Sequence, residues 1–160
     1  MGNTVYCLVH SEPEASAILT HLRNSGFGTE ISVLLQDRSD TKNISLKEDA
    51  ARGAGIGSIL GALVALTVPG VGAVFAIGPI VAAFGGAVAG GAVGGLLGGA
   101  GALKPLGLPD EVAKRLHHRI SEGDILISVE SEDPAKLRTA IRIVQSEGAS
   151  EIFDNSPKAA

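Results

Sequence analysis

The chain has 160 residues, a formal net charge of −4 at neutral pH and a single cysteine. This length predicts one ordinary domain, or one domain with a large insertion. The acidic balance argues against general nucleic-acid binding, which needs a basic surface, and one cysteine excludes an internal disulfide framework. The N-terminus lacks the basic start and apolar run of a secretory signal, so we expect a protein that stays inside the cell.

The N-terminal part of the chain predicts a strand, a helix and a second strand. The apolar, β-rich run Thr4–Val9 is typical of a strand. Ser11 precedes Glu14 by three residues, as in a capping box that begins a helix, and we predict this helix over Pro13–Ser25. The second strand is predicted over Glu30–Leu35.

The middle of the chain is free of charged residues. From Gly53 to Leu103 it runs through 51 residues, of which 16 are Gly and 12 are Ala, whereas all 13 Lys and Arg and all 17 Asp and Glu lie outside. In an ordinary globular domain, charged positions recur on every surface element. We therefore predict an insertion with its own kind of packing over residues 44–108.

Glycines recur at four-residue intervals in this zone. Four residues make about one turn of α-helix, so each row forms a flat groove along which another backbone can approach closely. The intervening residues are mostly Val, Leu, Ile and Ala, which favours helix over disorder. We predict glycine-zipper helix packing at Gly53, Gly57, Gly61, Gly86, Gly90, Gly91, Gly94, Gly95, Gly98 and Gly99.

Proline and glycine divide the charge-free zone in two. The sequence predicts one helix over residues 46–68 and another over 79–103, joined by a bend. Together they form an α-helical hairpin whose glycine faces pair either within the chain or between subunits. The residues assigned to the bend are Pro69, Gly70, Gly78 and Pro79.

Helix and strand signals alternate again after the insertion. Proline or acidic residues begin each predicted helix and glycine follows it. The elements predicted, in order, are a helix over 109–122, a strand over Asp124–Glu130, a helix from Pro134 to Glu147 and a strand over Glu151–Phe153.

The two outer zones repeat one another. Residues 4–32 and 124–153 each contain a strand, then Ser-Glu, proline, a helix, glycine and a Glu-Ile strand. Two βαβ halves of this kind predict a ferredoxin-like βαββαβ sandwich, in which both helices cover one face of a four-stranded antiparallel sheet. The predicted fold class is α+β, with this ferredoxin-like lobe split by the Gly/Ala-rich helical hairpin.

The predicted division of the chain follows from this repeat and its interruption. It comprises the first βαβ half over 1–43, the glycine-zipper hairpin over 44–108, a helix plus the second βαβ half over 109–155, and a disordered tail over 156–160.

No residue pattern predicts catalysis. Nothing resembles a nucleophile–base pair, and the glycine runs near Gly53 and Lys104 miss the spacing of a phosphate loop. His117 and His118 are adjacent on a helix and point about 100° apart, so we assign them to a solvated face rather than to a metal. Cys7 has no positive neighbour and is expected to be buried. We expect neither an enzyme nor a cofactor or metal site.

Basic residues recur on two of the predicted helices. Such side chains can meet anionic lipid headgroups, but acidic residues interleave with them, so an ordinary solvated surface is favoured. The basic residues concerned are Arg115, Arg119, Lys136, Arg138 and Arg142.

The sequence is compatible with two environments for the apolar insertion, a membrane or the interior of a soluble oligomer. The run Pro79–Leu103 is long enough to cross about 30 Å of hydrocarbon, whereas the arm that begins at Gly53 is short for a full pass. The alternative is a soluble oligomer in which the helices bury one another. A monomer that exposes the hairpin to water is rejected, because its apolar patch would be too large. A homo-oligomer is expected in either case.

The segment around and after the insertion resembles bacterial general-stress and low-temperature-induced proteins with a glycine zipper. The order VPG, Gly-Pro, Gly/Ala repeats and then GLPDE at residues 107–111 carries the resemblance, which covers roughly residues 50–130. Glu122 replaces a glycine of the family pattern, and His118 or its neighbour replaces an aromatic residue. The resemblance implies a stress-associated, non-enzymatic bacterial protein, often membrane-associated.

These observations lead to one expected function and two alternatives. We expect a stress-associated homo-oligomer, on or in the lipid bilayer at the cytoplasmic side of the inner membrane. One alternative is a soluble scaffold or shell protein that forms a large cytoplasmic assembly, with the hairpins buried at subunit contacts. The other is a small-ligand sensor with paired ferredoxin-like lobes.

Overall fold

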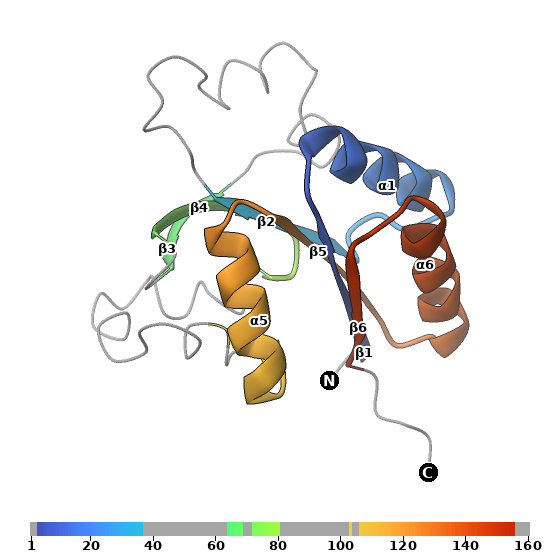
Figure 1. Ribbon diagram of the computed structural model, residues 1–160. Coiled ribbons are helices and arrows are strands. Elements are labelled where there is room, and N and C mark those ends of the chain that lie inside the picture. The colour runs from blue at the N-terminus through green and yellow to red at the C-terminus, as the bar shows by residue number, and fades with distance from the viewer. Residues whose placement is uncertain (1–2, 37–63, 69–71, 81–102, 104–105, 156–160) are drawn as a thin grey trace.

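Antiparallel strands form one sheet with helices on both of its faces (Figure 1). The computed structural model describes residues 3–36, 64–68, 72–80, 103 and 106–155. The strand order is β3-β4-β2-β5-β1-β6, so the α+β class is confirmed. The elements are β1 (Asn3–Val9), α1 (Glu12–Asn24), β2 (Ile31–Gln36), β3 (Val64–Val68), β4 (Gly72–Ile77), α5 (Asp110–Ser121), β5 (Ile125–Ser131), α6 (Pro134–Ser146) and β6 (Glu151–Asp154).

Helices α1 and α6 begin at the residues that the sequence indicates. The Ser11 hydroxyl accepts a hydrogen bond from the Glu14 amide at 3.4 Å, and the Asp133 carboxylate accepts one from the Ala135 amide at 2.8 Å. Each supplies a partner to an amide that the first helical turn leaves without one. After α1 the chain turns at Gly26, whose φ of +90° is a conformation that glycine adopts without strain.

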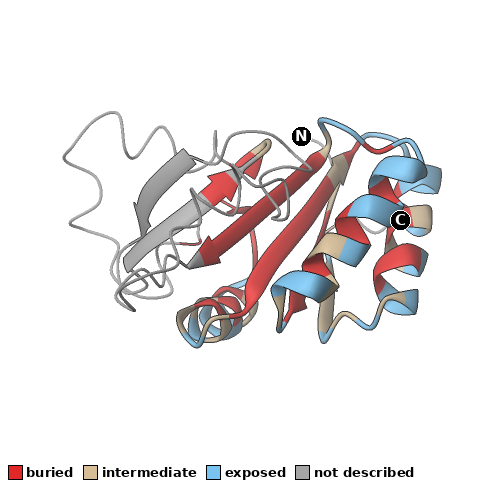
Figure 2. Cartoon of the chain, turned by 90° about the horizontal axis from the view of Figure 1, so that it is seen from above, coloured by how far each residue is buried: buried red, intermediate tan, exposed pale blue. Residues whose placement is uncertain are grey.

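Alternate side chains of the central strands pack into two apolar clusters, one on each face of the sheet. On β1, Val5, Cys7 and Val9 pack in the cluster of α1 and α6, whereas Tyr6 and Leu8 pack in the cluster of α5. This alternation follows from the two-residue period of a strand. The central strands are therefore buried on both sides (Figure 2), which explains their nearly continuous apolar sequence.

The structure corrects the predicted course of the insertion. The helix predicted over 46–68 is wrong at its end, because Val64–Val68 is strand β3, and the predicted bend contains strand β4. β3 pairs with β4, and β4 pairs with the outer edge of β2. The valine, threonine, phenylalanine and isoleucine residues of these two segments have high strand propensity. Within the described residues the sheet therefore has six strands rather than the predicted four.

Outside the insertion, the predicted helices and strands are confirmed with boundaries that shift by no more than one residue. The rest of the first zipper helix, most of the second and the predicted tail at 156–160 lie outside the described residues.

Candidate functional site

The stretch 81–102, which holds most of the predicted zipper glycines, joins the lobe at two points, which we call its roots. At the first root the Ile80 amide donates a hydrogen bond to the Ser32 hydroxyl at 2.9 Å, and both residues are buried. Gly78 has a φ of +90°, and a Cβ at this position would overlap the Ile31 carbonyl oxygen. Glycine is therefore required where the chain leaves β4 and passes close to β2.

At the second root the chain meets the same face of the sheet. Leu103 is fully buried and Leu106 is 8% exposed, and both belong to the apolar cluster that contains Ile80. The buried Tyr6 hydroxyl donates a hydrogen bond to the Leu106 carbonyl oxygen at 3.1 Å. One apolar cluster on one face of the sheet therefore holds both roots.

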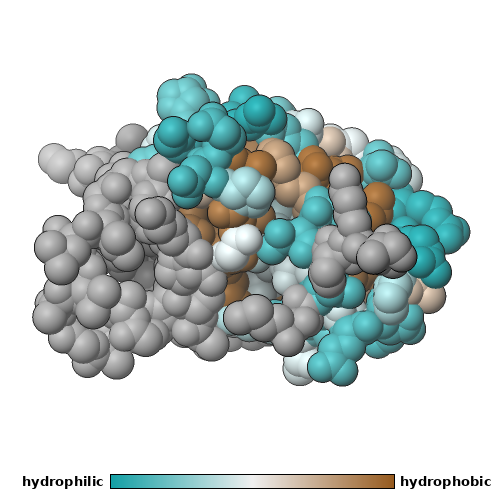
Figure 3. All heavy atoms as spheres, turned by 90° about the horizontal axis from the view of Figure 1, so that it is seen from below, coloured by the Kyte–Doolittle hydropathy of each residue, from teal (hydrophilic) through white to brown (hydrophobic). Residues whose placement is uncertain are grey.

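Helix α5 covers the cluster in which the roots are held. Its buried residues Ala113, Leu116 and Ile120 recur at helical spacing on one side. Phe153 of β6 packs against the same cluster and is partly buried. Seen from below, apolar side chains are visible between hydrophilic ones (Figure 3). Within the described residues, α5 is therefore the helix that covers this face of the sheet.

The structure places few of the residues predicted to form the site. Gly78 and Pro79 of the predicted bend follow β4 and are half-buried. The others lie outside the described residues, namely Pro69 and Gly70 of the bend and the zipper glycines Gly53, Gly57, Gly61, Gly86, Gly90, Gly91, Gly94, Gly95, Gly98 and Gly99.

A polar cluster that the sequence did not predict joins β1, β5 and α5. His10 Nδ1 lies 2.9 Å from Asp124 Oδ1, and Arg119 Nε lies 2.8 Å from Asp124 Oδ2. Arg119 Nη2 lies 3.4 Å from His10 Nε2. Because a carboxylate only accepts and a guanidinium only donates, these contacts fit a neutral His10 with its hydrogen on Nδ1. Arg119 thus lies beside Nε2, and the cluster links the end of β1 and the start of β5 to α5.

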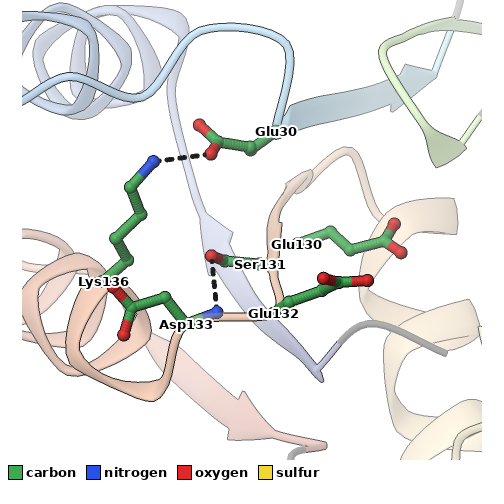
Figure 4. A pocket seen from close by; sticks show the side chains of 6 residues that line it. All are labelled: Glu30, Glu130, Ser131, Glu132, Asp133 and Lys136. Carbon is green, nitrogen blue, oxygen red and sulfur yellow. Dashed lines mark hydrogen bonds and ion pairs between the residues drawn. The ribbon is translucent and has the colours of Figure 1, made fainter.

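An open acidic hollow of about 410 Å³ lies between the end of β5 and the start of α6 (Figure 4). Lys136 Nζ lies 2.8 Å from Glu30 Oε1, and this hydrogen bond lowers the pKa of Glu30 and raises that of Lys136. The Ser131 hydroxyl accepts a hydrogen bond from the Asp133 amide at 3.2 Å. The remaining acidic residues that line the hollow are Glu130 and Glu132.

The predicted burial of Cys7 is confirmed. Its side chain lies inside the sheet with 1% exposure, and this burial raises the pKa of the thiol to about 12. A thiol that stays protonated is a poor nucleophile and a poor metal ligand. Cys7 therefore serves as a small apolar residue of the core.

His118 and the basic residues of the helices are exposed, as predicted, except that Arg119 and the neighbouring His117 are half-buried. The His118 side chain is 72% exposed, and its Nε2 lies 3.5 Å from Glu122 Oε1. Arg115 Nη1 lies 3.7 Å from Glu151 Oε2. Because α5 and α6 pack on opposite faces of the sheet, their basic residues do not form one continuous face.

Within the described ranges, no group of three or more His, Cys, Asp or Glu is placed to hold a metal ion. None of the helices in that part of the chain is both long and apolar enough to cross a membrane. The chain matches neither a family model, nor a curated protein, nor a solved structure.

Proposed function

We propose that this chain is a non-enzymatic, stress-associated protein that self-associates through its glycine-rich insertion. In this proposal the α+β lobe is the base that carries the insertion, and helices with glycine faces form the contact between subunits. The resemblance to bacterial general-stress proteins over roughly residues 50–130 supports the link to stress. No catalytic residue is needed for such a role.

One observation carries the proposal. The two roots of the stretch 81–102, at Ile80 and Leu103, lie in one apolar cluster on one face of the sheet. The lobe thus holds both ends of the glycine-rich stretch on the same side. A segment held in this way can present its glycine rows to a second copy while the lobe stays folded behind it.

We further propose that the lobe is ferredoxin-like. The part of the sheet in the order β2-β5-β1-β6, with α1 and α6 on one face, supports this assignment. In this view, α5 and the β3–β4 hairpin are additions that belong to the interrupted link between the two halves.

Replacing zipper glycines tests the contact between subunits. Leucine at Gly90 and Gly94 places bulky side chains on the glycine row and should force the helices apart. We expect the Gly90→Leu/Gly94→Leu chain to lose oligomer mass in sedimentation or light-scattering measurements. Gly28→Leu is the matched control, because Gly28 is exposed, has no positive φ and has open space around its Cβ position. An unchanged mass in the double variant would contradict the proposal.

Cell fractionation with carbonate extraction determines what surrounds the contact. If the insertion associates with the inner membrane, we expect the chain to stay with membranes in carbonate and to enter solution with detergent. If the whole chain is recovered in the soluble fraction as one large particle, the membrane part of the proposal is wrong. That result would favour the soluble scaffold instead.

A further inference from the structure

The two edges of the sheet differ in how they are protected from pairing with another chain. β6, at one edge, has acidic residues at both ends, Glu151 and Asp154. β3, at the other edge, has the sequence VALTV with no charged residue. Native edge strands usually avoid edge-to-edge pairing by means of charge, proline or a bulge within the strand. Within the described residues β3 pairs with β4 alone.

The sequence of β3 is close to a palindrome. Val64, Leu66 and Val68 occupy alternate positions, so the pattern Val-x-Leu-x-Val is the same from either end. Two copies paired antiparallel about Leu66 would place each Val64 opposite Val68 of the other copy, and the two Leu66 opposite each other. A two-fold axis requires this self-complementarity, and aliphatic cross-strand pairs stabilise an antiparallel sheet.

From these observations we propose that β3 is an interface at which a second copy of this chain adds its own β3 antiparallel, so that one sheet continues across both copies. Charge favours a second copy at this edge over the opposite one. The chain has a net charge of −4, and pairing at β6 would bring acidic residues of two copies together. The edge at β3 lies inside the charge-free run from Gly53 to Leu103 and imposes no such repulsion.

This interface adds a second contact to the proposed self-association and does not depend on the glycine rows. The contact consists of backbone hydrogen bonds between strands, as in strand addition to a sheet edge. Mutations can therefore remove the glycine-row contact and the β3 interface separately, and each of the two proposals can be tested without the other.

Charge complementation at Leu66 tests the interface. In the Gly90→Leu/Gly94→Leu background, we expect the chain with Leu66 to form dimers and the Leu66→Lys and Leu66→Glu chains each to show half that mass. Like charges directly opposite one another destabilise the pair, whereas opposite charges stabilise it. Mixing the Lys and Glu chains should therefore restore the dimer. If both variants keep the mass of the Leu66 chain, or if the mixture fails to restore a lost dimer, the proposal is wrong.

The Leu66 variants test the β3 interface whether or not the glycine replacements change the mass of the oligomer. If the glycine replacements leave the oligomer unchanged but Leu66→Lys halves its mass, the zipper proposal fails and the strand interface stands. If the Leu66 variants do not fold, hydrogen exchange of the unmodified chain decides. Protection of the Val64–Val68 amides should rise between dilute and concentrated protein, and protection independent of concentration would overturn the inference.

Discussion

The Tyr6 hydroxyl donates a hydrogen bond to the Leu106 carbonyl oxygen at 3.1 Å, in the buried layer between the sheet and α5. This bond joins residues 100 positions apart in the chain. It ties β1, which lies beside the edge strand β6, to the second root of the insertion. The lobe and the insertion are therefore coupled by a contact whose contribution is measurable.

Tyr6→Phe should destabilise the protein, because it leaves the buried Leu106 carbonyl without its donor. The expected loss is about 1–3 kcal/mol in the free energy of unfolding, measured by urea denaturation. Thr20→Val is the control, because the Thr20 hydroxyl bonds the Ser16 carbonyl on an exposed helix face and its removal should change stability little. Equal effects for the two substitutions would contradict the assignment.

Gly78 should be the least replaceable of the described glycines. Gly78→Ala combines a positive φ with overlap against the Ile31 backbone, whereas Gly26→Ala has the positive φ with open space. A left-handed alanine costs about 1–2 kcal/mol, so Gly26→Ala should lose about that amount and Gly78→Ala clearly more. Gly28→Ala, with neither feature, should stay near the parent. Denaturation curves of the three variants test this order, which any other ranking would contradict.

Stability should fall at alkaline pH because of Cys7. Burial raises the pKa of its thiol to about 12 in the folded chain, from an ordinary value of 9.0. Since the unfolded chain releases this proton first, the stabilisation is complete below about pH 9 and is lost between there and about pH 12. Each pH unit in this window removes about 1.4 kcal/mol. Cys7→Ala should show a shallower loss with pH in urea denaturation, and parallel pH curves for the two proteins would contradict this.

The Asp124 carboxylate should stabilise the protein through its contact with Arg119. A double-mutant cycle of Asp124→Asn with Arg119→Gln should give a coupling energy of about 0.5–3 kcal/mol, because the Asp124 side chain is only 11% exposed. The same cycle on Glu111 and Lys114, which are 85% and 63% exposed, should give no coupling above error. A coupling at the buried pair as small as at the exposed one would show that the contact is incidental.

The outer zones could be predicted from the sequence because their signals are local. Ser11 and Asp133 each cap the helix that begins directly after them, and Gly26 turns the chain directly after α1. The β3–β4 hairpin is missing from the prediction because the helix indicated by the glycine row at Gly53, Gly57 and Gly61 is extended across Val64–Val68, which has strand propensity of its own. β4 pairs with β2, far away in the sequence, and β3 pairs with β4, so this hairpin also depends on tertiary pairing.

The site was predictable only in part for the same reason. Glycine spacing predicts which residues would form a zipper, whereas the roots depend on contacts such as Ile80 with Ser32 and Tyr6 with Leu106. These residues are 48 and 100 positions apart, and nothing in their local sequence indicates the contacts. The polar cluster around Asp124 could not be predicted either, because His10 follows β1 and meets Arg119 of α5 and Asp124, which precedes β5, only in the folded chain.

Close approach of two chains at the glycine rows is the central claim, and a single introduced cysteine measures it most directly. In a Cys7→Ala background, the Gly90→Cys chain has one thiol, and a disulfide requires Cα atoms within about 4.4–6.8 Å. We predict that mild oxidation converts this chain to a covalent dimer far faster than the Gly28→Cys chain at equal concentration. Equal rates of cross-linking at the two positions would contradict the account.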